Sequence, residues 1–162
     1  MKFNRTIATK LAIVYIVAFA SLAQAKSGEV TTNNCVSGEI LSSTEIAPKQ
    51  SIMTFKYLGV VRTVPSGRII DLASYTCQGT ISTVGEAPAT FGHCLYIDKD
   101  GDKFATRFSG IPGRGSKAEI LGGSGKFIGV KGSGETKVTL LTSFPGNISI
   151  CAEAQWKYTQ PD

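Results

Sequence analysis

The sequence predicts an all-β domain of eight or nine short antiparallel strands, arranged as an up-and-down barrel or as a sandwich. Helical periodicity is nearly absent after residue 25, and short apolar or alternating runs are separated by Gly, Pro, Asp and Ser. The clearest run is 148–159, where every even-numbered residue from Ile148 to Tyr158 is apolar. Such alternation gives a strand one buried and one solvated face. A barrel is favoured because closure removes exposed strand edges.

Strands are expected wherever such a run lies between turn residues. A first strand at 34–46 ends before Pro48, and a long strand at 51–64 is bulged or broken at Gly59. Segment 26–34, before them, is expected to be a disordered lead-in. The other strands are expected at 69–83, 89–98, 102–109, 116–121, 126–132, 135–143 and 148–159, with a Gly-rich turn between 116–121 and 126–132.

Residues 1–25 have the three parts of a secretory signal peptide. All of their charges are basic, and an apolar stretch from Leu11 to Leu22 ends at the small-x-small cleavage site Ala23-Gln24-Ala25. This stretch is shorter than the roughly 20 residues that a membrane-spanning helix needs. The first cysteine, Cys35, lies too far from the cut for a lipoprotein. The chain is therefore expected to be secreted or periplasmic, without a membrane span in its mature part.

Charge and length limit the expected partners and domains. The chain has 17 Lys and Arg against 12 Asp and Glu, but three basic residues lie in 1–25, which leaves 14 against 12, a net charge of +2. No basic cluster remains, so nucleic acid is not an expected partner. Removing 25 of the 162 residues leaves 137, which suits a single domain at 26–162.

All four cysteines lie in the mature part, and an even number in an exported chain predicts disulfides. Four cysteines allow three pairings. Cys77 and Cys94 lie on consecutive expected strands around a turn near Gly85, and that hairpin would place them opposite each other. This predicts Cys77–Cys94 and, by elimination, Cys35–Cys151. No C-x-x-C motif is present, so no metal site is expected.

Two polar segments suggest ligand loops but fit turns better. Asp98-Lys99-Asp100-Gly101-Asp102 offers three alternating carboxylates for Ca²⁺, yet it lacks the Gly and Glu spacing of an EF-hand. The Asp-Gly pair instead favours a hairpin turn. Segment 122–127 has a Gly-Lys pair, but it lacks the earlier Gly, the following Ser or Thr, and the helix of a phosphate-binding loop.

Candidate site residues are few. His93 is the only imidazole and alternates with Phe91 and Leu95, so it is expected to point into the interior. A structural role for His93 is favoured, but it is the first catalytic candidate, followed by Glu39 and Tyr75. Asn147-Ile148-Ser149 is a glycosylation sequon, which matters only in a eukaryotic host. The residues expected either to line a ligand cavity or to fill the core are Tyr75, Phe91, His93, Phe104, Phe108 and Trp156.

The segment from Ile120 to Gly132, ILGGSGKFIGVKG, resembles the "GGTGKFAGARG" hairpin of dirigent proteins, which recurs in the allene oxide cyclase barrel superfamily. The region from Tyr96 to Phe108, with its turn at Asp98–Asp102, fits the same scheme. The resemblance covers about the second half of the mature chain. It implies an eight-stranded antiparallel barrel of the calycin or allene oxide cyclase type, with a central apolar cavity. It also implies a protein that steers reactive intermediates and forms dimers or trimers, although the catalytic acids of the family have no matching motif here.

Three functions remain open from the sequence. The first is binding of a small, mostly apolar molecule in the barrel, without chemistry and without a cofactor. The second is a cofactor-free cyclase or a dirigent-like isomerase. The third is an interaction module that acts through the outer face, with a homo-oligomer among the expected assemblies.

Overall fold

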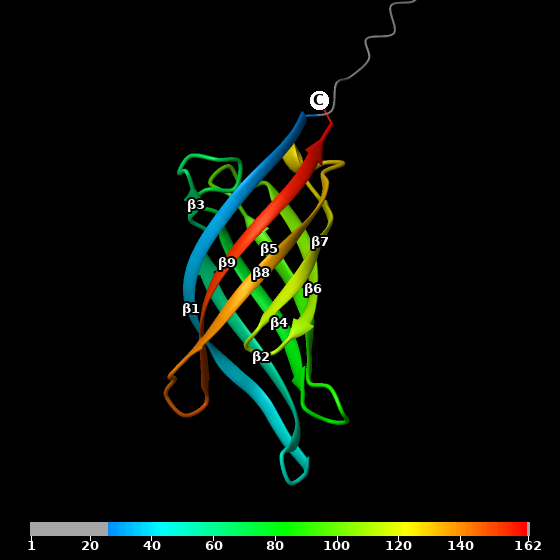
Figure 1. The fold of residues 1–162 in the computed structure, drawn as a ribbon. Helices are drawn as coiled ribbons and strands as arrows, with labels where there is room; N and C mark the ends of the chain where they lie inside the picture. The colour runs from blue at the N-terminus through cyan, green and yellow to red at the C-terminus, as the bar shows by residue number, and fades with distance from the viewer. Residues whose placement is uncertain (1–25, 162) are drawn as a thin grey trace, which may run out of the picture.

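The structure is a computed structural model that describes residues 26–161, so the predicted signal peptide lies outside the described residues. The described chain forms a closed antiparallel barrel (Figure 1), as predicted. The elements are β1 (Lys26–Ala47), β2 (Gln50–Val60), β3 (Thr63–Val64), β4 (Ser74–Ser82), β5 (Ala89–Ile97), β6 (Lys103–Ile111), β7 (Gly115–Gly123), the 3₁₀ turn η1 (Gly125–Phe127), β8 (Lys131–Leu141) and β9 (Asn147–Gln160).

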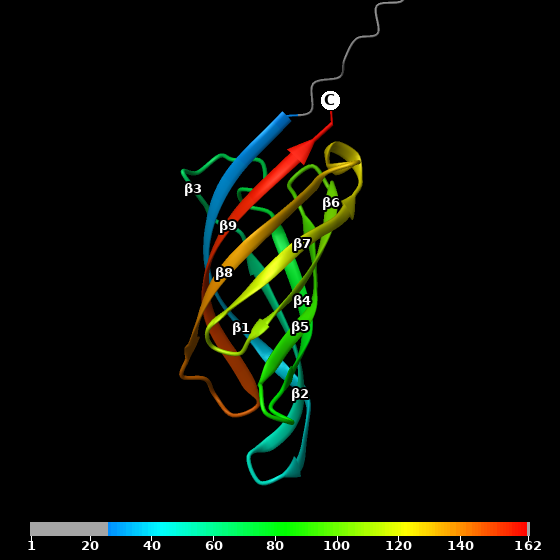
Figure 2. The same cartoon turned by 45° about the vertical axis from the view of Figure 1, so that its right-hand side comes forward.

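Eight strands make the ring and one short strand is added to it. The strand order is β2-β4-β5-β6-β7-β8-β9-β1-β3, and pairing of β1 with β2 closes the circle. Strand β1 is long enough to pair with β9 along its first part and with β2 along its last part. Beyond the pair Glu39↔Asn147 it leaves β9, and the β1–β2 hairpin projects past the rest of the barrel (Figures 1 and 2).

Four predicted boundaries are wrong. The strand expected at 51–64 with a bulge or break at Gly59 is instead β2, which pairs with β4 in unbroken register through Gly59, followed by the separate two-residue strand β3. Residues 26–34 are not a lead-in, because they form the first part of β1 and pair with the end of β9, from Lys26↔Gln160 onward. Residues 69–73 precede β4 as a loop. The segment 126–132 is not a strand, because η1 occupies its start and β8 begins only at Lys131. The strands expected at 126–132 and 135–143 are therefore replaced by one, β8.

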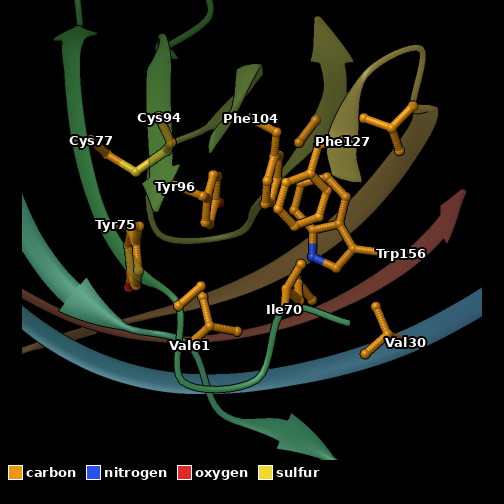
Figure 3. Close-up of a cluster of buried hydrophobic side chains, with 14 residues drawn as sticks. Val30, Val61, Ile70, Tyr75, Cys77, Cys94, Tyr96, Phe104, Phe127 and Trp156 are labelled. Carbon is orange, nitrogen blue, oxygen red and sulfur yellow. A yellow bond between two sulfur atoms is a disulfide. The ribbon is translucent and has the colours of Figure 1, made fainter. Parts of the chain in front are cut away.

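One end of the barrel is closed by a packed aromatic core. The ring of Tyr96 stacks on Phe104 with centroids 4.4 Å apart, and Phe104 lies 4.9 Å from Phe127 of η1. Trp156 covers Gly134 on the neighbouring strand, where a Cβ would come within 2.7 Å of the indole. Ile70, from the loop before β4, completes this closed end (Figure 3).

The β5–β6 turn is tied to η1 by charged and backbone contacts. The predicted hairpin turn is present, with Gly101 in the left-handed region and Asp98 N–H donating to the Asp102 carbonyl. The ammonium of Lys126 pairs with the carboxylate of Asp98 and lies 3.4 Å from that of Asp100. The backbone N–H of Lys126 donates to the Asp102 carboxylate, 3.1 Å away. These contacts hold η1 over the closed end.

Both predicted disulfides are confirmed, and they lie on opposite faces of the wall. Cys77–Cys94 joins β4 to β5 and faces the interior, where Cys77 is 2 % exposed. Cys35–Cys151 joins β1 to β9 and lies on the outer face. The structure therefore has one covalent link inside the barrel and one outside.

Among residues 26–161, no helix is long and apolar enough to span a membrane.

Candidate functional site: the barrel lumen

The lumen is a cavity of about 110 Å³ inside the open half of the barrel. Its walls come from all eight strands of the ring, because the side chains that face inward alternate with those that face solvent. The cavity runs from Tyr96 and Trp156, near the closed end, to Ile111 and Leu140 at the opposite end. Ile111 and Leu140 are both exposed, so this end is the mouth of the lumen.

The closed end leaves almost no free space. Between Ile70, Phe104, Phe127 and Trp156 the remaining space is only about 20 Å³. A space of that size holds little more than one water molecule. A ligand can therefore occupy the lumen from the mouth inward only as far as this core.

A small polar cluster interrupts the apolar wall of the lumen. It consists of Asn34 of β1, Tyr57 of β2, Tyr75 of β4, Tyr96 of β5 and Thr106 of β6, all of which line the cavity. The amide nitrogen of Asn34, Nδ2, donates a hydrogen bond of 2.9 Å to the phenol oxygen of Tyr75. The Tyr75 ring is 5.4 Å from that of Tyr96 and 6.2 Å from that of Tyr57. These contacts join four of the five members, on the neighbouring strands β1, β2, β4 and β5.

Two buried polar atoms in this cluster have no hydrogen-bond partner among the described residues: Oδ1 of Asn34 and Oγ1 of Thr106. The Thr106 side chain is 1 % exposed and lies beside the Tyr96 phenol. Buried polar atoms are nearly always paired in proteins, since an unpaired one costs about 1–3 kcal/mol. The two atoms are therefore free to bind a polar group that enters the lumen.

The three phenols are neutral at physiological pH. Burial raises the pKa of Tyr57, Tyr75 and Tyr96, since removal from water disfavours the charged phenolate. The described residues that line the lumen include no Asp, Glu, His, Lys or Arg. The lumen thus offers hydrogen bonds and apolar surface, and no charge.

Of the six residues expected either to line a ligand cavity or to fill the core, three line the lumen: Tyr75, Phe108 and Trp156. Phe104 belongs to the packed core of the closed end. The interior position expected for Phe91 and His93 is wrong, because both lie on the outer face and Phe91 is 52 % exposed. Glu39 also lies on the outer face of β1. Neither His93 nor Glu39 can therefore act on a molecule in the lumen.

The orientation of β5 has a clear physical cause. Cys94 must face inward to reach Cys77, and Tyr96 then stacks on Tyr75 from the same side. Gly92, two residues before Cys94, leaves room for Phe108, since a Cβ there would lie 2.7 Å from that ring. The odd-numbered residues of β5 are consequently directed to solvent.

Sequence reasoning missed Asn34, Tyr57 and Thr106 as site residues. The predicted Cys77–Cys94 disulfide was a partial signal, because it places Cys94 and its alternate neighbour Tyr96 on the same face as Cys77 and Tyr75. It does not tell which face is the inner one, since the Cys35–Cys151 disulfide lies on the outer face. No comparable signal marks Asn34, which depends on the pairing of β1 with β9.

The fold and lumen define a class: an antiparallel eight-stranded barrel with one closed end and an apolar interior. This chain has the fold of dirigent proteins, since it is similar to the structure of the pterocarpan synthase dirigent protein GePTS1, with a TM-score of 0.53 and 12 % identity over 85 % of this chain and 86 % of that chain. It also matches the pterocarpan synthase dirigent protein PsPTS1, with a TM-score of 0.47 and 13 % identity over 84 % of this chain and 96 % of that chain. No family model and no curated protein matches the sequence.

Proposed function

We propose that this protein is an exported carrier that binds one small, uncharged, mostly apolar molecule in the lumen, without catalysis. The observation that carries the proposal is the cavity itself, which is lined by apolar side chains and neutral hydrogen-bonding groups. Ligand sites are usually concave, mostly apolar and equipped with a few polar groups that orient the ligand.

The size and the charge of the lumen limit the ligand. Apolar cavities of about 150 Å³ bind molecules as large as benzene. The lumen, at about 110 Å³, is smaller than that but is open at Ile111 and Leu140, so a molecule with one small ring or a short branched chain fits with part of it at the mouth. Because no charged group lines the cavity, an ionised ligand would lose its hydration without gaining a counter-charge.

The test is direct binding of small neutral probes to the purified mature protein. Trp156 is the only tryptophan and lines the lumen, so its fluorescence should change when cyclohexanol enters. The variant Ala118→Leu adds volume inside the lumen and should abolish this change. Ser109→Leu, on the outer face of β6, is the matched control and should bind normally.

Near-ultraviolet circular dichroism should first establish that both variants fold. Binding that survives in a folded Ala118→Leu variant would place the ligand elsewhere and contradict the proposal.

Export is part of this proposal. The two disulfides are consistent with an oxidising compartment, and the sequence of 1–25 has the features of a leader. The expected result is that the exported product begins at Lys26, as determined by N-terminal sequencing. An exported product that retains residues 1–25 would contradict the cleavage.

The alternative is a dirigent-like isomerase, and the fold is the observation that favours it. The similar structure is that of a pterocarpan synthase dirigent protein, and three neutral phenols face the lumen here. Turnover of a substrate would be lost in Tyr75→Phe if a phenol donates a proton in the reaction. Binding with no turnover by wild-type protein would favour the carrier.

A further inference from the structure

We infer that the lumen selects ligands that carry a hydroxyl group, which Asn34 and Tyr75 bind together; this rests on the proposed carrier function. The inference concerns one polar group of the ligand, whereas the proposed function concerns its size and its lack of charge.

The amide of Asn34 provides the first half of the argument. Its nitrogen already donates to Tyr75, and its oxygen is buried without a partner among the described residues. An amide oxygen only accepts hydrogen bonds. A ligand that satisfies this atom must therefore bring a donor.

The phenol of Tyr75 provides the second half. Its oxygen accepts the hydrogen bond from Asn34, which leaves its own O–H available as a donor. A ligand hydroxyl next to both groups can donate to Asn34 Oδ1 and accept from Tyr75. A carbonyl can only accept, so it would leave Asn34 Oδ1 unpaired.

The position of Asn34 suits this role. It lies opposite Ala152 of β9, and Ala152 also lines the cavity. Val30, four residues earlier on the same strand, already belongs to the closed core. From Asn34 toward the mouth the walls are mostly apolar, with Val138, Leu140 and Ile150 among them. A bound molecule would therefore place its hydroxyl at the inner part of the lumen and its apolar part toward the mouth.

Thr106 does not provide the same selection. Its hydroxyl is also unpartnered, but a hydroxyl can both donate and accept. It can therefore bind an alcohol or a ketone equally well, and the discrimination is assigned to Asn34.

The experiment compares three probes of one shape by isothermal titration calorimetry: cyclohexanol, cyclohexanone and cyclohexanecarboxylate. Wild-type protein should bind cyclohexanol at least about tenfold more tightly than cyclohexanone, since the ketone leaves one buried acceptor unpaired. Cyclohexanecarboxylate should not bind, because the lumen offers no counter-charge.

The deciding variant is Asn34→Leu, which keeps the volume and removes the acceptor. It should bind cyclohexanol and cyclohexanone within about twofold of each other. Asn33→Leu is the matched control, because Asn33 is the neighbouring residue on β1 and faces solvent. It should keep the wild-type preference.

The outcomes separate this inference from the function on which it rests. Equal affinity of wild-type protein for the alcohol and the ketone, or a preference for the ketone, overturns the inference and leaves the carrier function standing. Preference retained in a folded Asn34→Leu variant overturns the assignment to Asn34. If no probe binds at all, the carrier function fails and the inference fails with it. If Asn34→Leu does not fold, the ratio of the wild-type affinities for cyclohexanol and cyclohexanone still tests the selection for a hydroxyl group.

Discussion

Phe104 and Phe144 have opposite surroundings, and replacing each with alanine should have opposite consequences. Phe104 is 5 % exposed, stacked on Tyr96 and in tilted contact with Phe127, whereas Phe144, between β8 and β9, is 85 % exposed. Phe104→Ala should lower the free energy of unfolding by about 3–5 kcal/mol, because it removes buried surface and leaves a void. Phe144→Ala should change it by less than about 0.5 kcal/mol. Urea unfolding of both variants measures the difference, and similar losses would contradict the closed core.

Asp98 should make the protein sensitive to acid. Although desolvation opposes it, hydrogen bonds from Lys126 and from the backbone N–H groups of Asp100 and Asp102 hold the pKa of Asp98 below its usual value. A carboxylate with a lowered folded-state pKa stabilises the fold above its unfolded pKa of about 4. That contribution is lost as the pH falls through the folded-state pKa.

The expected result is a fall in the urea midpoint below about pH 4 that is smaller in Asp98→Asn than in wild-type protein. Lys126→Met, which removes the partner cation, should reduce the same fall. An identical pH dependence in all three proteins would show that this ion pair does not contribute.

At the scale of elements, the two disulfides should differ in accessibility. Cys35 is exposed on the outer face, whereas Cys77 and Cys94 are only 2 % and 6 % exposed and line the lumen. With limiting reductant and an alkylating reagent, mass spectrometry should find Cys35 and Cys151 labelled first. A saturating lumen ligand should slow the labelling of Cys77 and Cys94 further. Labelling of the inner pair first would contradict its position inside the barrel.

The strands that could be predicted from the sequence are those bounded by turn residues, such as β5, which was expected at 89–98 and found at Ala89–Ile97. Strand β9 was expected at 148–159 and spans Asn147–Gln160, since its even-numbered residues from Ile148 to Tyr158 are all apolar. The first part of β1 was missed because segment 26–34 is mostly polar. This segment becomes a strand because it pairs with β9, starting at Lys26↔Gln160. Such pairing between distant parts of the chain cannot be seen in a local sequence pattern.

The error at 126–132 has a different cause. Its apolar residues, Phe127, Ile128 and Val130, look like a strand, but Phe127 is drawn into the closed core from a 3₁₀ turn. The contact of Lys126 with Asp98 fixes that turn, and the two residues lie 28 positions apart in the sequence. Long-range contacts of this kind determine the backbone conformation of a segment whose local preference for strand or turn is weak.

The candidate site was predictable only in part, for the same reason. In β5 both alternate sets contain apolar residues, so the pattern alone did not separate Phe91 from Tyr96. The disulfide between β4 and β5 places Cys94 and Tyr96 on the same face as Cys77, and burial in the closed barrel makes that face the inner one. Thr106 alternates with Phe104 and Phe108 on β6, so its inward position follows from the local pattern. Asn34 lies among polar residues on β1, and only closure of the ring turns it toward the cavity.

At the scale of the whole molecule, closure of the ring by β1 and β9 should permit circular permutation. Lys26 and Gln160 are register partners, so a short Gly-rich linker can join the two ends. New termini at Gly85, an exposed position with φ of 86° between β4 and β5, interrupt no strand. The permutant should give the wild-type β-rich circular dichroism spectrum and form both disulfides. A control permutant opened at Ala154, buried in β9, should not fold; equal failure of both would contradict the expected tolerance at Gly85.

The closed end of the barrel also determines how the proposed ligand would enter and leave. Because the barrel has a single opening, the proposed ligand would enter and leave by the same route. A second molecule could not displace the first from the opposite end. The end of the proposed ligand that lies deepest in the lumen would contact Asn34 and Tyr75. The other end, at Ile111 and Leu140, would be exposed to solvent. The group at the buried end of the proposed ligand should therefore affect its affinity more than substituents at the end that lies at the mouth.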